Sequence, residues 1–233
     1  HFFLQRLCLL FDCDGTLVDS EPLLAEVMAD TLNRVGLPFA ARQYMEEFRG
    51  VRFMTIVAEL ERRHGALDAT VRSAAEAEMR KTMALRMARE LQPIPHVRET
   101  LDALSDLPRC VASNGPEHKI RNALDSTGLR RYFDERLYSG YTLQCWKPDP
   151  GLFLHAARSM GFMPEQCVVI DDAAVGVAAG LAAGMRVVHI NRFAEEERTP
   201  DGAISMTDMG QLPGILARLA ETVSRVMPVA AAR

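Results

Sequence analysis

Two aspartates, Asp12 and Asp14, stand two positions apart directly after an apolar run, Leu7–Phe11, that we expect to form a buried strand. Residues two apart in an extended segment point to the same side, so the two carboxylates could face one small volume. Like charges that close are costly to ionise together, and a bound cation or a raised pKa relieves the cost. The spacing therefore indicates a chemical site at the carboxyl end of a strand, where open α/β sheets bind ligands.

Three further stretches place polar side chains where an expected strand ends or an expected helix begins. They are Ser113-Asn114-Gly115 after a strand at 109–113, Lys147 before a helix that starts near Pro150, and Asp171-Asp172 after a strand at 167–170. Taken alone, Ser113-Asn114-Gly115 is more typical of a plain turn, Lys147 is more typical of a surface charge, and Asp171-Asp172 is as typical of a helix cap or turn as of a functional pair. In a doubly wound sheet, however, all these ends converge on one edge. Their joint occurrence in one chain therefore indicates a site.

The converging groups suit the transfer of a phosphoryl group. Mg²⁺ takes oxygen ligands and neutralises phosphate charge, and Asp12, Asp171 and Asp172 could supply such ligands. The Ser113 hydroxyl and the amides that follow it at a helix start offer an anion site. Lys147 would add a fixed positive charge beside the transferring oxygens. We therefore expect Mg²⁺ as the cofactor and a small phosphorylated metabolite as the partner.

Alternating strand and helix patterns predict an α/β fold with a doubly wound parallel sheet. We also expect strands at 136–138 and 186–190, helices at 97–107, 150–160, 175–184 and 212–226, and a helix that ends at Leu124. From about 21 to 90, apolar residues instead recur three and four positions apart, which predicts helices at 21–35, 40–48, 54–64 and 68–91. The simplest organisation is an α/β core at 1–18 and 92–233 with a helical cap domain inserted at 19–91.

The composition argues against several classes of protein. The 233 residues carry a net charge of −4, which gives no electrostatic reason to expect nucleic acid or an anionic membrane as a partner. No apolar run approaches the ~20 residues that span a bilayer. The five cysteines include no C-x-x-C pair, so we expect neither a zinc site nor a disulfide framework, and we expect core thiols at Cys8, Cys110 and Cys167, which stand in apolar runs. With no visible signal peptide, these thiols predict a cytoplasmic protein; the oligomeric state is not indicated, and a monomer is compatible with the sequence.

Four motifs make the chain similar to the haloacid dehalogenase superfamily of phosphotransferases. FDCDGTLVDSE at 11–21 resembles its first motif, D-x-D-G-T, and VIDDAAVGVAAGLAAGM at 169–185 resembles its fourth, while Ser113 and Lys147 resemble the second and third. The helical insertion resembles the cap of the subfamily that contains β-phosphoglucomutase and small sugar-phosphate phosphatases. Within this subfamily, the 6-phosphogluconate phosphatase type looks most similar, on the stretches FRGV at 48–51, SNGP at 113–116 and SGY…WKPDP at 139–150.

The resemblance implies a role for each candidate residue. Asp12 would be the nucleophile that forms an aspartyl-phosphate, and Asp14 would protonate the leaving group and then activate water. Ser113, Asn114 and Lys147 would hold the phosphoryl group, with Gly15, Thr16 and Gly115 as further phosphate-binding candidates. The candidate metal ligands are Asp12, Asp14, Asp171 and Asp172. Ala173 stands where the family often has serine, so we expect a looser orientation of the acidic pair.

Three other reactions of the superfamily are alternatives to phosphate ester hydrolysis. Dehalogenases lack the second aspartate, so Asp14 argues against that reaction, and a phosphonate hydrolase needs a cap lysine, where the chain has only Lys81 on an expected solvated face. A β-phosphoglucomutase is harder to exclude because it shares the core residues. Its cap arginine falls at Phe53 here, with Arg49 and Arg52 nearby but offset, which favours hydrolysis. These two arginines are candidates for substrate contacts and are equally typical of surface charges.

A non-catalytic phosphoacceptor is the alternative from another class, since it too uses an acidic cluster, a hydroxyl and a lysine on such a sheet. Receivers of that kind are shorter and carry the acid pair before the acceptor, whereas D-x-D comes first here. Cys13 lies between the aspartates without an evident base, so we expect a structural thiol. The sequence thus predicts a Mg²⁺-dependent phosphatase for a small phosphate monoester, and the family resemblance implies that this is a sugar or sugar-acid phosphate such as 6-phosphogluconate.

Overall fold

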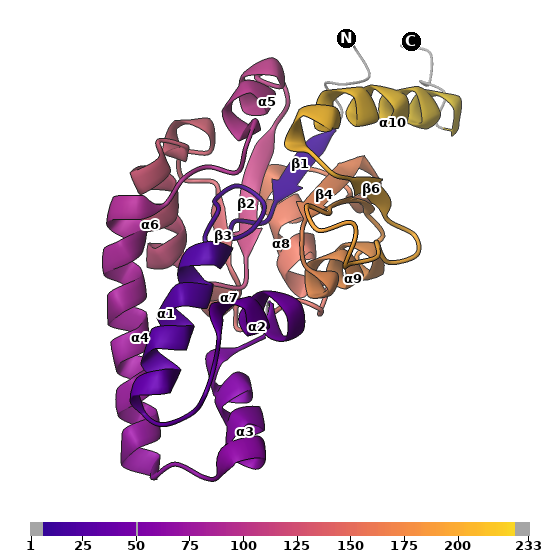
Figure 1. The fold of residues 1–233 in the computed structure, drawn as a ribbon. Helices are drawn as coiled ribbons and strands as arrows, with labels where there is room; N and C mark the ends of the chain where they lie inside the picture. The colour runs from indigo at the N-terminus through magenta and orange to yellow at the C-terminus, as the bar shows by residue number, and fades with distance from the viewer. Residues whose placement is uncertain (1–6, 50, 227–233) are drawn as a thin grey trace. The chain divides into compact units, whose positions relative to one another are not determined.

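The computed structural model describes residues 7–49 and 51–226; Gly50 of the FRGV stretch, residues 1–6 and residues 227–233 lie outside the described chain. The chain divides into two compact units, one formed by the segment up to Val18 and the segment from Pro93 onward, the other by Asp19–Gln92 (Figure 1). Val18 and Pro93, where the chain leaves and re-enters the first unit, pair in an isolated antiparallel bridge.

The first unit is built on a six-stranded parallel sheet with the order β3-β2-β1-β4-β5-β6. The strands are β1 (Cys8–Phe11), β2 (Arg109–Ser113), β3 (Leu137–Ser139), β4 (Cys167–Asp171), β5 (Arg186–Ile190) and β6 (Ile204–Met206). From β1 the chain adds strands on one side, and at β4 it returns to the other side of β1. The predicted doubly wound sheet is therefore confirmed. The reversal between β1 and β4 creates the crevice where such sheets bind ligands.

Helices cover both faces of this sheet. They are α5 (Val97–Ala103), α6 (Glu117–Thr127), α7 (Gly140–Leu143), α8 (Gly151–Met160), α9 (Ala174–Ala182) and α10 (Leu212–Val226), with 3₁₀ turns at Arg130–Tyr132, Pro164–Gln166 and Met209–Gln211. Cys8 and Leu10 of β1 pack into one core cluster with residues of α8 and α9. On the opposite face, the ring of Phe11 meets that of Phe133 edge to face, with 5.8 Å between centroids. Burial on both faces explains why the strands are continuous apolar runs.

Two elements of this unit differ from the expectation. Helix α5 ends at Ala103 instead of 107, and the chain then turns, with the Leu107 amide donating to the Leu104 carbonyl at 3.0 Å. The carbonyls of Leu104 and Leu107 also accept hydrogen bonds from the Arg109 guanidinium at 2.9 and 3.4 Å. Strand β6 was not expected, since its three residues are too few to show an alternating pattern.

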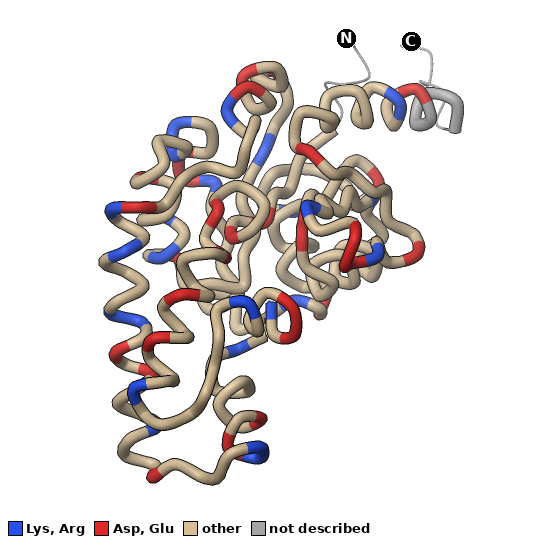
Figure 2. The backbone as a smooth tube through the Cα atoms, in the orientation of Figure 1, with Lys and Arg blue, Asp and Glu red and all other residues tan. Residues whose placement is uncertain are grey.

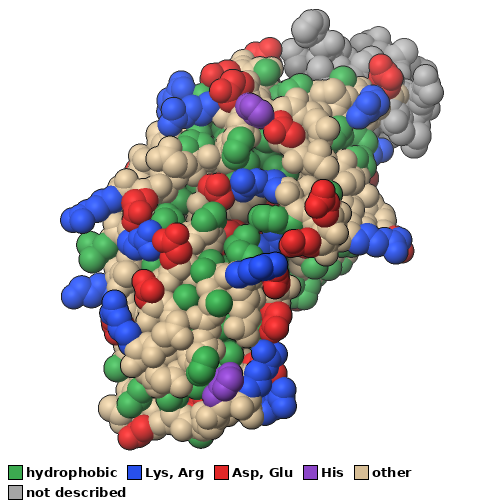
Figure 3. Space-filling model, viewed as in Figure 1, with side chains coloured by type: hydrophobic (Ala, Val, Ile, Leu, Met, Phe, Trp, Pro, Cys, Tyr) green, Lys and Arg blue, Asp and Glu red, His purple; other side chains and the backbone are tan. Residues whose placement is uncertain are grey.

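The second unit is all helical, with α1 (Glu21–Arg34), α2 (Ala41–Gln43), α3 (Phe53–His64) and α4 (Ala69–Glu90). The expected helix at 40–48 is instead a short α-helical segment followed by a π-helical turn at Tyr44–Phe48. Met79, Met83 and Met87 recur four apart on the buried side of α4, which packs against α1. Basic and acidic residues are interspersed along these helices in Figure 2, and Figure 3 shows both signs side by side on one face of the molecule.

The structure confirms the expectation of core thiols at Cys8, Cys110 and Cys167, whereas Cys145 is half-buried. Cys8, Cys110 and Cys167 lie on adjacent strands and are at most 1% exposed, and all five thiols are free. Within residues 7–49 and 51–226, no helix combines the length and apolar character needed to cross a membrane.

Candidate active site

The ends of β1 and β4 bring three carboxylates together. Phe11 and Ile170 are register partners, and the Asp12 amide donates a hydrogen bond to the Ile170 carbonyl at 2.9 Å. Asp12 therefore leaves β1 beside Asp171, the last residue of β4, and Asp172, which follows it. One ligand atom from each of the three carboxylates lies within 4.8 Å of the other two. This group lies at the reversal of strand order and belongs entirely to the α/β unit.

Lys147 enters the same group from the loop before α8. Its Nζ lies 3.0 Å from Asp12 Oδ1 and 2.8 Å from Asp171 Oδ2, and its side chain is 3% exposed. The ring of Phe153 supports the ammonium, with 4.9 Å between Nζ and the centroid. When all four groups are ionised, three carboxylates and one ammonium carry an excess of two negative charges. Oxygen ligands with that excess fit a divalent cation.

The electrostatics of the group reflect this excess. Burial and the adjacent Asp171 carboxylate raise the pKa of Asp12 from 3.8 to about 7, against the opposing effect of Lys147. Burial by itself would lower the pKa of Lys147, but Asp12 and Asp171 outweigh it and hold the ammonium charged. The crowding that the sequence predicted between Asp12 and Asp14 thus arises between Asp12 and Asp171, carboxylates far apart in the chain.

The D-x-D-G-T turn approaches the group from the β1 side. The Cys13 carbonyl accepts hydrogen bonds from the amides of Thr16, Leu17 and Val18, which curls the segment back on itself. Gly15 has φ +79°, a left-handed conformation that favours glycine, and a Cβ there would overlap the Asp172 carboxylate. The buried Thr16 hydroxyl donates to Asp172 Oδ1 at 3.1 Å. Both residues, expected to bind phosphate, are thus in contact range of Asp172.

Asp14 does not belong to the three-carboxylate group found among the described residues. The strand ends at Phe11, so the rule that residues two apart face the same side does not extend across the turn that follows. Asp14 was expected among the metal ligands but has no place in this group. Cys13 is buried, and burial together with Asp14 and Asp12 raises the pKa of its thiol. A thiolate is disfavoured there, which agrees with the structural role expected for Cys13.

The second motif follows β2. The buried Ser113 hydroxyl accepts a hydrogen bond from the Gly115 amide at 3.0 Å. The Asn114 side chain holds the Lys147 backbone at both ends: its Oδ1 accepts from the Lys147 amide at 2.7 Å, and its Nδ2 donates to the Lys147 carbonyl at 3.2 Å. The Asn114 side chain thus clamps the lysine segment, and a phosphate contact of Asn114 stays a prediction.

Arg49 and Arg52 belong to the helical unit. Arg49 directly follows the π-helical turn and is half-buried, whereas Arg52 directly precedes α3 and is exposed. Phe53, at the position of the mutase cap arginine, is buried in that unit. The two arginines stay candidates for substrate contacts.

Three supporting residues were missed from the sequence. A Cβ at Gly176 would overlap the Asp171 carboxylate, and the glycine-rich pattern of α9 was the only signal. The Ser139 hydroxyl donates to the Gly115 carbonyl at 2.6 Å, and His189 contacts the Asp172 carbonyl; neither had a signal. The backbone amide of Ala173 donates a hydrogen bond to Asp171 Oδ1 at 2.9 Å. The Asp171 carboxylate is therefore held even without the serine hydroxyl that the family often has at this position.

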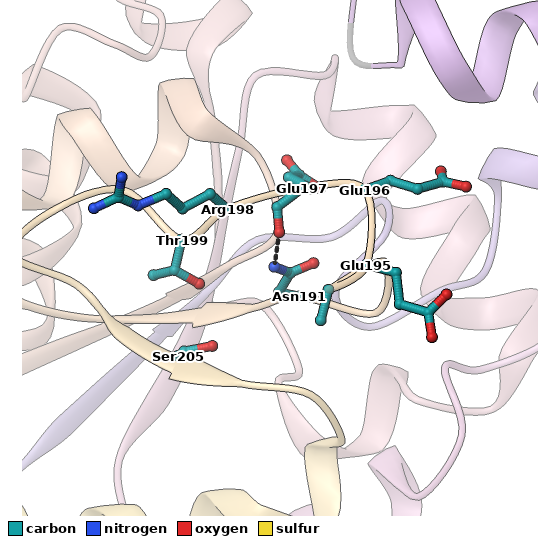
Figure 4. Close-up of a pocket in the computed structure, with 8 residues that line it drawn as sticks. Asn191, Glu195, Glu196, Glu197, Arg198, Thr199 and Ser205 are labelled. Carbon is teal, nitrogen blue, oxygen red and sulfur yellow. Dashed lines mark hydrogen bonds between the residues drawn. The ribbon is translucent and has the colours of Figure 1, made fainter.

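A separate pocket of about 440 Å³ lies beside the loop that follows β5 (Figure 4). It is lined by Asn191, Ala194, Glu195, Glu196, Glu197, Arg198, Thr199 and Ser205. None of these is a candidate site residue, and the chemistry described above lies outside it.

A protein-family model described as haloacid dehalogenase-like hydrolase matches residues 7–184. The chain belongs to the haloacid dehalogenase-like hydrolases. Similar curated proteins include 6-phosphogluconate phosphatase of Escherichia coli strain K12, 34% identical over 206 residues that cover 87% of this chain and 91% of the relative. Hexitol phosphatase B of the same organism is 30% identical over 187 residues, which cover 79% and 83% of the two chains.

Among solved structures, a haloacid dehalogenase family hydrolase from Deinococcus radiodurans R1, with bound phosphate and sodium, is 29% identical and has a TM-score of 0.74. The match covers 91% of this chain and 95% of that one. The resemblance predicted from the motifs is thereby confirmed, and this family member is an enzyme, a phosphoric monoester hydrolase.

Proposed function

We propose that this phosphatase hydrolyses a small sugar or sugar-acid phosphate, with Mg²⁺ held by Asp12, Asp171 and Asp172. The observation that carries the proposal is the three-carboxylate group beside Lys147 at the β1/β4 reversal. Its oxygen atoms and its excess of negative charge suit a hard divalent cation. When bound, Mg²⁺ supplies Lewis-acid stabilisation of the charge on the phosphoryl oxygens.

Asp12 is the proposed nucleophile. Its Oδ1 is held by Lys147, and its amide is fixed to β4, so the carboxylate has a defined direction at the strand end. Attack forms a bond between Asp12 and phosphorus while the ester P–O bond breaks. Lys147 offsets negative charge beside the phosphoryl oxygens in this step. Water then attacks phosphorus, which releases inorganic phosphate and restores Asp12.

Asp14 is the proposed acid and base. It is partly exposed at the turn that follows Asp12 and stands outside the carboxylate group, so it can carry a proton without competing for the cation. In the first step it protonates the leaving alkoxide, and in the second it accepts a proton from the attacking water.

The names of the relatives support the substrate class: one acts on 6-phosphogluconate and another on hexitol phosphates. Phosphate release should be measured with Mg²⁺ on 6-phosphogluconate, hexitol phosphates and β-glucose 1-phosphate. We expect release from a sugar-acid or hexitol phosphate. Isomerisation of β-glucose 1-phosphate without phosphate release would instead establish the mutase reaction.

The role of Asp12 is tested with Asp12→Asn, for which we expect turnover on the best substrate to fall by at least about 10³-fold, since a nucleophile is removed. Asp30→Asn, on an exposed position of α1, is the matched control and should retain full turnover. Near-normal turnover of Asp12→Asn would refute the proposed nucleophile.

A further inference from the structure

The buried histidine of β5 makes an unexpected contact with the acidic strand end. His189 is 0% exposed and is the register partner of Asp171. Its Nε2 lies 3.0 Å from the carbonyl oxygen of Asp172, and its Nδ1 lies 2.8 Å from the Thr199 hydroxyl oxygen. The ring thus connects Asp172, the residue directly after β4, to the loop that follows β5.

The partners define the protonation of the ring. A carbonyl oxygen can only accept, so Nε2 carries a proton and donates to Asp172, and in the neutral ring Nδ1 accepts from the Thr199 hydroxyl. The hydroxyl therefore fixes both the tautomer and the orientation of the ring. Hydrogen bonds of this kind behind a metal ligand commonly decide how well the ligand is oriented.

Asp172 is held from two sides as a result. Thr16 of the turn after β1 donates to its carboxylate, and His189 of β5 donates to its backbone carbonyl. Asp172 follows the last residue of β4, where no further strand pairing fixes the backbone. The histidine substitutes for that missing restraint at the position from which the carboxylate reaches the group.

We propose that His189 is a positioning residue for the cation: its bond to the Asp172 carbonyl holds the Asp172 carboxylate at the distance from Asp12 and Asp171 that a divalent cation needs. This rests on the proposed Mg²⁺ site. It adds a residue that contacts neither the metal nor the substrate.

The chain provides matched variants for a test. His189→Gln keeps a donor that reaches the position of Nε2, whereas His189→Asn is too short to reach the Asp172 carbonyl. Asn191→Ala is the control for general loosening, because Asn191 anchors the same loop through Nδ2 to the Glu197 carbonyl at 2.6 Å, as the dashed line in Figure 4 shows. Thr199→Val keeps His189 as the donor to Asp172 but removes the hydroxyl partner of Nδ1 that orients the ring.

The measurement is the dissociation constant of the full-length, EDTA-treated protein for Mg²⁺ by calorimetry and for Mn²⁺ by electron paramagnetic resonance, without substrate. We expect His189→Asn to raise both constants about tenfold or more, as is typical when a residue behind a metal ligand is removed. His189→Gln should restore most of the affinity, Thr199→Val should have a smaller effect than His189→Asn, and Asn191→Ala should bind as the wild type does. Circular dichroism and metal-free Tm verify that each variant is folded.

Wild-type affinity in His189→Asn, or an equal loss in Asn191→Ala, would overturn the positioning role. If His189→Asn does not fold, the other variants decide: a loss of affinity in His189→Gln as large as that in Asp172→Asn would refute it. A wild-type protein that binds neither ion would remove the proposed metal site itself, which is a different result from binding that ignores His189.

Discussion

The ion pairs compared in the α/β unit and in the helical unit differ in their exposure to solvent. At the ends of β1 and β4, Lys147 is shared by Asp12 and Asp171, and its side chain is 3% exposed. In the helical unit, Arg86 lies 2.7 Å from both Glu26 and Glu90, and the two glutamates are about half exposed. The two regions use similar distances between oppositely charged atoms in very different surroundings.

The difference shows what each arrangement can contribute. An exposed pair gains little, because water screens the attraction and ordering long side chains costs entropy. A buried group must offset a large desolvation cost, and hydrophobic residues of similar volume would often be as stable. Charges that stay buried at a strand end, with an excess of carboxylates, are therefore better explained by chemistry than by stability.

The strongest test of this contrast compares Lys147→Met with Arg86→Met. Loss of Lys147 leaves Asp12 and Asp171 buried without their shared ammonium, so we expect turnover to fall about 10²–10³-fold and the unfolding free energy to fall by about 3–5 kcal/mol. Arg86→Met should keep full turnover and lose less than about 1 kcal/mol. Phosphate release and urea denaturation measure both quantities; equal effects of the two substitutions would contradict the contrast.

The pH dependence of the unfolding free energy of the metal-free protein sharpens the contrast between the buried and the exposed charges. Folding raises the pKa of Asp12 from 3.8 to about 7, so its contribution to stability is fully present below about pH 4 and is lost as pH rises through about 7. The loss is at most about 4 kcal/mol, since one pKa unit corresponds to about 1.4 kcal/mol.

The change of unfolding free energy with pH is measured by urea denaturation in the presence of EDTA between pH 4 and 8. Asp12→Asn removes the titrating group and should flatten the curve, and saturating Mg²⁺ should flatten it in the wild type, because the cation favours the ionised carboxylate. A slope that persists unchanged in Asp12→Asn would assign the pH dependence to another group.

The smallest expected effect concerns two helical glycines. Ala at Gly176 would overlap the Asp171 carboxylate, so we expect Gly176→Ala to cost about 1–3 kcal/mol, typical of overpacking, and to weaken Mg²⁺ binding. Gly214 on α10 has open space around it, and Gly214→Ala should stabilise by up to about 1 kcal/mol. Thermal denaturation and calorimetry distinguish them; a tolerated alanine at 176 would show that the carboxylate is free to move.

The sequence predicted much of this molecule because the signals are local. Apolar runs located β1, β2, β4 and β5, and the three-and-four spacing between Glu21 and Glu90 located a helical insertion. Weak or ambiguous signals account for the differences. Strand β6 is too short for a pattern, and a π-helical turn at Tyr44–Phe48 cannot be told from an α-helix by spacing alone.

By itself, the sequence determined which residue types stand at the strand ends and that a D-x-D-G-T turn follows the first strand. Only the tertiary structure decided their partners. It grouped Asp12 with Asp171 and Asp172, left Asp14 outside that group, and turned the Asn114 side chain to the Lys147 backbone. The physical reason is that periodicity along a chain reports which side a residue faces, whereas the lateral order of strands and the direction of side chains after a strand end depend on contacts between distant segments.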